Sequence, residues 1–412
     1  MSFIKSSANK TPIVDTVFSI VKLAKQDIEK NGKENVVDAT IGSLYDESGK
    51  IVAYDSVFNH YDAIPHATKA KYAESFKGNV TYRKEVYNWV TQNKDIKLAH
   101  DIIATPGGTG AVALSITSFL DKGQTVLLPE IAWGSYKLMA SENGIQIDYY
   151  KNFNGDHFNL ESVSEKIVSL QKKQDKVVMI LNDPCHNPTG YSLTHCEWDK
   201  LVEILNEASK KTPVILINDI AYIDYSNALD NSRDYMECFN NISDNVMITV
   251  AFSCSKTLTS YGMRCGALIL FAQKETDVND TMTVMEKYAR ATWSNINNSA
   301  MDNFVYVVTD NRDNFLKEKE TYIDIMKERS DLFLKEAKDC GLDIYPYKEG
   351  FFVTLKIEDQ KLAEKVHSAF MDHHIYTVLV NKGIRVAVCS VSVSKVKGLA
   401  KKMKDIINSL SE

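Results

Sequence analysis

The sequence predicts an α/β fold: a three-layer, mostly parallel sheet with helices on both faces, joined to a smaller α+β domain from both chain ends. Three observations indicate this fold. The chain has 412 residues, more than one compact core usually organises. From about residue 100 to 270, short apolar runs alternate with longer amphipathic runs, which is typical of strand–helix units and a parallel sheet. After residue 300 the pattern changes to long helices with a few short strands.

Seven runs in the central region have the character of strands. Several are apolar at every position, as expected for strands that helices cover on both faces. The runs are 101–105, 124–129, 145–150, 176–183, 213–219, 245–252 and 265–271. Amphipathic segments such as GAVALSITSFL and CEWDKLVEILNEASK lie between them. In such sheets ligands bind beyond the carboxyl ends of the strands, so the residues that follow each run are candidates for a site.

The last hundred residues differ from the centre. Residues 313–340 place apolar side chains at helical spacing, and Gly341 is the predicted C-cap. Strand-like runs at 351–357 and 384–390 follow, and then a final helix. We expect residues 1–50 to form an N-terminal arm and part of the small domain, 51–305 the large domain, and 306–412 the small C-terminal domain.

Charge and cysteine content argue against several classes of protein. The net charge of −6 is small for this length, and no basic stretch suggests binding to nucleic acid or a membrane surface. No apolar run reaches the roughly eighteen residues that a membrane-spanning helix needs, and the N-terminus does not resemble a signal peptide. The seven cysteines form no CxxC pairs, so we expect reduced thiols, no metal site and a cytoplasmic location.

The segment SCSKTLTSYGMRCG, residues 253–266, carries the most chemical information. Lys256 follows an apolar strand, where desolvation lowers the pKa of an amine and frees it to attack a carbonyl carbon. Ser253, Ser255 and Arg264 supply hydroxyl and guanidinium donors that suit a phosphate. From this segment alone, a solvated loop with a surface lysine and arginine is the alternative.

Two other predicted strands also end in polar residues. Asp219 ends the run PVILIND, where its carboxylate would keep a heterocyclic nitrogen protonated. Tyr222 follows three residues later and would donate its hydroxyl to a phenolate oxygen. Asn187, in the turn Asn-Pro-Thr-Gly, would bond to the same oxygen. The plain alternatives are a helix-capping aspartate and a tight turn.

The segment TPGGTGAVALSI, residues 105–116, permits two interpretations. Its glycines and the start of a helix suit a phosphate. However, the spacing Gly108-x-Gly110-x-x-Ala113, with Glu130 after the next strand, also fits the dinucleotide fingerprint of an NAD-dependent dehydrogenase. That alternative leaves Asn187, Asp219, Lys256 and Arg264 without a role.

The order GGTGA, aromatic residue, NPTG, DxAY, SxSK and an arginine eight residues after the lysine resembles one family. This family is the fold-type I pyridoxal-phosphate aminotransferases of class I, which act on aspartate and aromatic amino acids. The resemblance runs from about residue 38 to 390. It implies pyridoxal 5'-phosphate as cofactor, a homodimer, and ping-pong transfer of an amino group from an L-amino acid to a 2-oxo acid such as 2-oxoglutarate. A β-lyase on the same fold is the alternative.

The resemblance also implies roles for residues that hold the cofactor. Lys256 matches the Schiff-base lysine, and Asp219 matches the partner of the pyridine nitrogen. Asn187 and Tyr222 match the residues that contact the ring hydroxyl. The remaining matches are the phosphate cup and the aromatic residue stacked on the ring: Gly108, Thr109, Ser253, Ser255, Arg264 and Trp133. Tyr72, in YAESFKG, resembles the tyrosine that reaches the phosphate of the neighbouring subunit.

Four residues bear on the substrate in addition to Trp133 and Asn187. Arg385 lies in the apolar run IRVAVCS, where a guanidinium is costly without a partner, and it matches the arginine that binds the α-carboxylate. Arg290, four residues before Ser294, resembles the arginine that grips a side-chain carboxylate across the dimer interface, although INNSAM replaces the usual proline-containing stretch. Gly42, in IGSLYDESGK, resembles a substrate-lid glycine. The plain alternatives are a salt bridge, a surface arginine and a turn.

Overall fold

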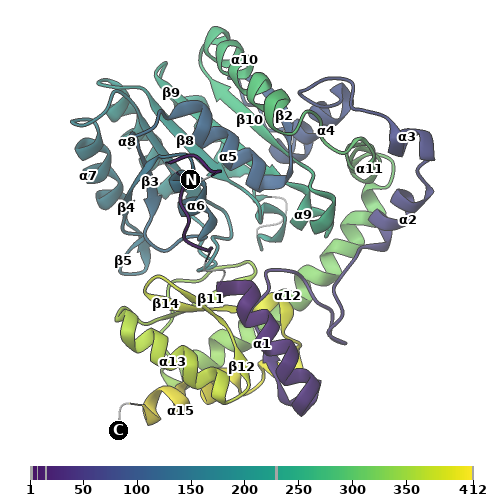
Figure 1. Ribbon diagram of the computed structural model, residues 1–412, viewed down its shortest axis with the longest axis vertical. Helices are drawn as coiled ribbons and strands as arrows, with labels where there is room; N and C mark the ends of the chain where they lie inside the picture. Colours follow the sequence, from purple (N-terminus) through teal and green to yellow (C-terminus); the bar gives the residue numbers. More distant parts are fainter. Residues whose placement is uncertain (1–2, 7, 14–15, 228–230, 411–412) are drawn as a thin grey trace.

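The computed structural model describes residues 3–6, 8–13, 16–227 and 231–410. Figure 1 shows a large α/β part and, below it, a smaller part made from both ends of the chain. The long helix α12 (Arg312–Cys340) runs between the two parts. Among the helices that these ranges contain, none combines the length and the apolar character needed to cross a bilayer.

The large part is built on a seven-stranded sheet with the order β2-β10-β9-β8-β7-β3-β4. Its strands are β2 (Ala99–Thr105), β3 (Thr125–Pro129), β4 (Gln146–Tyr150), β7 (Val177–Asn182), β8 (Val214–Asp219), β9 (Val246–Ser253) and β10 (Gly266–Ala272). Strand β10 is antiparallel to both of its neighbours, and the other described pairings are parallel. The seven predicted strands and the mostly parallel sheet are therefore confirmed, with small shifts at the strand ends.

Strand β7 illustrates why the sheet has helices on both faces. Val177, Met179 and Leu181 belong to one buried cluster, whereas Val178 and Ile180 belong to another. This alternation follows from the two-residue period of a strand. Helices that share the first cluster include α4 (Val80–Thr91), α7 (Leu160–Leu170) and α8 (His195–Ser209). Those that share the second are α5 (Gly107–Phe119), α6 (Ser135–Glu142) and α10 (Glu275–Thr292).

The small part combines segments that lie far apart in the sequence. Its three-stranded antiparallel sheet has the order β11-β14-β13, with β11 (Phe352–Lys356), β13 (Val378–Val380) and β14 (Gly383–Ala387). Helices α13 (Gln360–Asp372) and α15 (Leu399–Ser409) share its apolar cluster. Strand β1 (Val37–Asp38) pairs with β12 (Ile375–Tyr376), and α1 (Thr16–Asn31) contacts β12 and β13. Helix α1 and strand β1 therefore pack on the C-terminal region.

Helix α12 contributes to both cores. Phe315 and Ile323 belong to the cluster of the large sheet, whereas Phe333 and Ala337 belong to the cluster of the small one. Gly341 ends the helix with a φ of 67°, a left-handed conformation that glycine adopts without steric cost. The predicted helix and its C-cap are thus confirmed. The division of the chain at residues 50 and 305 stays a prediction.

Three shorter helices complete the side of the molecule next to the start of α12. They contact one another through α11, and they are α2 (Asp55–Ala63), α3 (His66–Ala70) and α11 (Asn298–Val308). The one-turn helix α9 (Cys254–Thr257) follows β9 directly and carries Lys256. This connection positions the lysine at the edge of the sheet.

Candidate active site

A cavity of about 370 Å³ lies at the carboxyl-terminal edge of the large sheet, between that sheet and the small part. The ends of β7, β8 and β9 all reach it, as expected for a ligand site in an open α/β sheet. The structure brings together at this cavity twelve of the residues selected from the sequence: Gly42, Gly108, Thr109, Trp133, Asn187, Asp219, Tyr222, Ser253, Ser255, Lys256, Arg264 and Arg385.

Lys256 projects its amine into the cavity. Its Nζ atom donates to the carbonyl oxygen of Gly42 at 2.5 Å and lies 4.7 Å from the centre of the Tyr261 ring. Burial lowers the pKa of Lys256 to about 8, and the nearby guanidinium groups of Arg385 and Arg264 act in the same direction. A minor but useful fraction of this amine, about a fifth, is therefore neutral near physiological pH and available as a nucleophile or a base.

The lowered pKa gives a testable pH dependence. Only the neutral amine reacts with electrophiles, so labelling of Lys256 is expected to rise with pH and to reach half its maximum near pH 8. An unperturbed lysine would require a pH of about 10.4. The measurement is peptide mass spectrometry after brief treatment with an amine-reactive probe whose own charge does not change with pH. Surface Lys274 serves as the internal control, and a shared midpoint for both lysines would contradict the proposed desolvation.

Asp219 is the last residue of β8 and is almost fully buried. Tyr136 Oη donates to Asp219 Oδ2 at 2.6 Å, and the Ala221 amide donates to Oδ1 at 3.0 Å. Burial raises the pKa of Asp219 to about 6, while these two donors oppose the rise. The carboxylate therefore remains largely ionised at neutral pH while it faces the cavity.

An arrangement of donors suited to an anion lies at the start of α5. Arg264 Nη1 donates to Ser255 Oγ at 3.2 Å, and Arg264 Nη2 to the Pro106 carbonyl at 3.4 Å. A Cβ atom on Gly107, whose φ is 71°, would lie 2.6 Å from Arg264 Nη2, so glycine is needed for this close approach. The amides at the start of α5, with these hydroxyl and guanidinium groups, are a set of donors that suits an anion such as a phosphate.

Arg385, on β14, is buried at the opposite side of the cavity. Its Nη1 atom donates to Asn187 Oδ1 at 3.1 Å and its Nη2 atom to the Thr40 carbonyl at 2.7 Å. Its Nε atom has no hydrogen-bond partner, and no ion pair within the described ranges involves this guanidinium. A buried cation without a counter-charge is costly, so the cavity favours a ligand that carries a carboxylate.

The segment that contains Gly42 is held in place by buried groups. Tyr261 Oη accepts from the Leu44 amide at 3.0 Å. Arg329, on α12, donates to Glu47 Oε1 at 2.6 Å and to the Cys389 carbonyl at 2.9 Å. These contacts fix the Gly42 carbonyl opposite the Lys256 amine.

Two selected residues lie outside the cavity. Tyr72 is 80% exposed. Arg290, on α10, is exposed; its Nη1 atom bonds to Ser294 Oγ, and its guanidinium lies 4.8 Å from the centre of the Phe76 ring. In the single chain, therefore, neither residue reaches the site.

The dinucleotide interpretation of residues 105–116 finds no support in the geometry. Gly110 lies inside α5, and its side-chain position is blocked by the Pro106 ring. The Glu130 carboxylate pairs with Lys382 Nζ at 2.8 Å, so it is engaged with the small part. The residues that this interpretation left without a role are the ones that line the cavity.

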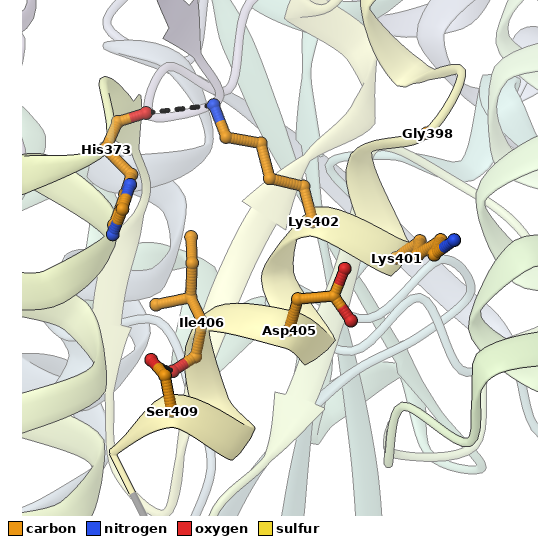
Figure 2. Close-up of a pocket in the computed structure, with 7 residues that line it drawn as sticks. All are labelled: His373, Gly398, Lys401, Lys402, Asp405, Ile406 and Ser409. Atoms are coloured by element: carbon orange, nitrogen blue, oxygen red, sulfur yellow. Dashed lines mark hydrogen bonds between the residues drawn. The ribbon is translucent and has the colours of Figure 1, made fainter.

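A second hollow, of about 430 Å³, lies on the surface of the small part and has no comparable chemistry (Figure 2). Its side chains come from α15 and from His373 after α13. Lys402 Nζ donates to the His373 carbonyl at 3.1 Å. The polar side chains that line this hollow, the lysines included, are exposed.

The structure adds residues that the sequence analysis missed. Tyr136 lies three residues after Trp133, at the start of α6, and its hydroxyl bonds to Asp219. Asn182 links two selected residues, because its side chain donates to the Asp219 carbonyl and accepts from the Asn187 amide. Val17 and Val21 of α1 also line the cavity, and no pattern in the sequence pointed to them.

A buried amine with a lowered pKa, a buried carboxylate and a helix start suited to an anion are the features expected of an α/β enzyme that holds a phosphorylated ligand beside a reactive lysine. The family "Aminotransferase class I and II" matches residues 45–403, and the chain therefore belongs to that family. Enzymes of this family use pyridoxal 5'-phosphate.

Known proteins support this assignment. The crystal structure of an aminotransferase from Anaerococcus prevotii superposes with a TM-score of 0.95 at 31% identity, covering 99% of this chain and 100% of that one. The aspartate aminotransferase of Pseudomonas aeruginosa is 23% identical over 68% of this chain and 72% of its own length. The aromatic-amino-acid aminotransferase of the same organism is 27% identical over 47% of this chain and 47% of its own length. Several curated relatives are thus matched over about half their length.

Proposed function

We propose that this chain is a pyridoxal-phosphate-dependent aminotransferase that moves an amino group from an L-amino acid to a 2-oxo acid such as 2-oxoglutarate. One observation carries the proposal. The Lys256 amine, the Asp219 carboxylate and the Arg385 guanidinium, which has no carboxylate partner among the described residues, line the same cavity. An amine, a partner for a ring nitrogen and a partner for a carboxylate are the three groups that such a reaction needs from the protein.

The residues of the cavity fit this cofactor. The phosphate would bind at the start of α5 between Gly108, Thr109, Ser253, Ser255 and Arg264, where Gly107 leaves room for Arg264. Asp219 would pair with the pyridine nitrogen, and Asn187 and Tyr222 would bond to the ring oxygen. Trp133, half-buried at the cavity wall, would stack on the ring. Lys256 would provide the point of covalent attachment.

Each protein group then has a physical task. When bound, the cofactor withdraws the electron pair that is released as the substrate Cα atom loses its proton. Arg385 binds the α-carboxylate and so orients the Cα–H bond toward Lys256. The Lys256 Nζ atom removes this proton as a general base and later returns it as a general acid. Gly42 and Trp133 border the substrate and limit the entry of water.

A screen of amino donors tests the proposed reaction. The purified protein, supplied with pyridoxal phosphate, is expected to produce a 2-oxo acid from aspartate or an aromatic amino acid when 2-oxoglutarate is present. Production of the 2-oxo acid is followed for each donor, and ping-pong kinetics are expected. Release of ammonia without any acceptor would instead indicate the β-lyase alternative, and no turnover with any donor would contradict both.

We also propose that the chain is a homodimer in which each subunit completes the site of its partner. Tyr72 and Val80 are 80% and 61% exposed, and Phe76 is 39% exposed beside Arg290. Exposed apolar side chains, one of them beside a cation, suit a surface that a second copy covers. Through this surface Tyr72 would reach the cofactor phosphate, and Arg290 would reach a side-chain carboxylate of the substrate. Light scattering of the purified protein measures the oligomeric state.

Replacing Arg290 with alanine is expected to affect acidic and aromatic amino donors differently. Loss of the guanidinium is expected to raise the KM for aspartate or glutamate about 10- to 100-fold, while the KM for aromatic donors changes little. Steady-state kinetics with both classes measure this difference. Arg312→Ala, which removes another arginine that stacks on an aromatic ring but lies away from the cavity, is the control. Equal losses for both classes would remove Arg290 from the substrate site.

Two further assignments are part of the proposal. The large domain of residues 51–305 would bind the cofactor, and residues 1–50 and 306–412 would form the small domain and the arm. A cytoplasmic location agrees with the seven cysteines, all of which are free thiols.

A further inference from the structure

The hydroxyl of Tyr136 is the strongest contact of the Asp219 carboxylate. Tyr136, on α6, is 1% exposed, and its Oη atom lies 2.6 Å from Asp219 Oδ2. Among the residues that the structure describes, the other oxygen accepts only the Ala221 amide, at 3.0 Å. Within the described ranges, no lysine, arginine or histidine forms an ion pair with Asp219. The negative charge is thus held by two neutral donors, of which only the hydroxyl comes from a side chain.

We propose that Tyr136 is a positioning residue for the transamination proposed above: its hydroxyl keeps the Asp219 carboxylate ionised and directed at the pyridine nitrogen of the cofactor. Two physical reasons support this role. A short O–H···O⁻ hydrogen bond favours the charged form of a carboxylate in a buried site. The bond also occupies one oxygen, so the carboxylate cannot rotate freely about its own axis.

A tyrosine suits this task because it donates without titrating. Burial, together with the charge of Asp219, raises the pKa of Tyr136 well above its usual value. The phenol therefore stays protonated and remains a donor at every working pH. It adds no positive charge that would compete with the pyridine nitrogen for the carboxylate.

Removing the hydroxyl would change where one proton resides. Without the Tyr136 bond, the Asp219 carboxylate becomes a stronger base, since burial still disfavours its charge. Asp219 would then retain a proton that it otherwise leaves on the ring nitrogen of a bound cofactor. A cofactor with a less positive nitrogen would withdraw electrons less strongly, so removal of the Cα proton by Lys256 would be slower.

Tyr136→Phe tests this role, because it deletes one oxygen atom and keeps the ring. The ring packs edge-on against Trp133, with centroids 5.4 Å apart, and phenylalanine preserves that contact. We expect kcat to fall about 10- to 100-fold, the range for a lost hydrogen bond to a charged group, while the KM for the amino acid stays nearly constant. The decisive readout is not catalytic: the ¹⁵N chemical shift of the pyridine nitrogen, measured in full-length protein loaded with ¹⁵N-labelled cofactor, should move toward the value of neutral pyridine.

Tyr150→Phe is the matched control. Tyr150 is also fully buried and donates to a carbonyl, that of Ile180 at 3.0 Å, but it does not line the cavity. The ¹⁵N shift and kcat of this variant should equal those of the unmodified protein. An unchanged ¹⁵N shift in folded, loaded Tyr136→Phe protein would overturn the proposal.

A second experiment covers the case in which Tyr136→Phe does not fold. Incorporation of 3-fluorotyrosine at position 136 keeps the hydroxyl and makes it a stronger donor, so the ¹⁵N shift should move further toward the pyridinium value. A shift in the opposite direction, or none, overturns the proposal. If the unmodified protein neither binds the cofactor nor transaminates, the proposed function fails instead, and the two failures are therefore distinguishable.

Discussion

Replacing Lys256 with alanine is expected to lower kcat for transamination by at least about 10⁴-fold, because one side chain supplies both the covalent attachment and the proton transfer. The amine is suited to both tasks, since burial lowers its pKa to about 8 and its Nζ atom already projects into the cavity. The measurement is single-turnover kinetics with the preferred amino donor. The characteristic absorbance of the attached cofactor should also be absent from the variant after gel filtration.

Lys274→Ala provides the control for this result. Lys274 forms a surface ion pair with Asp244 at 3.1 Å and does not line the cavity. Its removal should leave both kcat and the absorbance unchanged. Full activity in a folded, colourless Lys256→Ala variant would refute the assignment of the active site.

Replacing Arg385 with lysine is expected to raise the KM for every amino donor about 100-fold, with a smaller change in kcat. Lysine keeps the positive charge but loses the planar pair of donors that a carboxylate engages. In the structure, this guanidinium bonds to Asn187 and to the Thr40 carbonyl and has an Nε atom without a partner. Because the α-carboxylate is common to all donors, aspartate and aromatic amino acids should be affected alike.

Steady-state kinetics with one donor of each class measure this effect. Arg83→Lys is the control, since Arg83 pairs with Asp101 at 3.3 Å away from the cavity. A normal KM in Arg385→Lys protein would show that the α-carboxylate binds elsewhere. An equal rise in KM for both classes of donor in Arg385→Lys protein would assign Arg385 to the α-carboxylate. A rise for acidic donors alone in Arg290→Ala protein would assign Arg290 to the side-chain carboxylate.

Much of the fold was predictable because it depends on local patterns. Several of the seven central strands are apolar at every position, and the structure indeed buries both faces of β7 in separate clusters. The 29-residue helix α12 and its cap at Gly341 followed from helical spacing and from the backbone freedom of glycine. The pairing of β1 with β12 was harder to predict from the sequence, because each of these strands has only two residues.

The candidate site was predictable where several residues lie in one short segment. Ser253, Ser255, Lys256 and Arg264 follow one strand, and all four line the cavity. Tyr136 was missed because its role depends on a hydrogen bond to a residue 83 positions away. The cavity-lining residues of α1 were missed for the same reason, since contact with the large sheet depends on how the small part packs.

The sequence by itself determined which reactive groups the protein contains, because it specifies each side chain and its position in the chain. The sequence predicts that an amine and a carboxylate follow or end apolar strands. It also predicts one guanidinium group close to that amine and another inside an apolar run. Only the tertiary structure decided which of them meet, how deeply each is buried and which remain outside, as Tyr72 and Arg290 do. Desolvation and hydrogen bonding depend on neighbours that are distant in the chain, and these neighbours lower the pKa of Lys256 and hold the charge of Asp219.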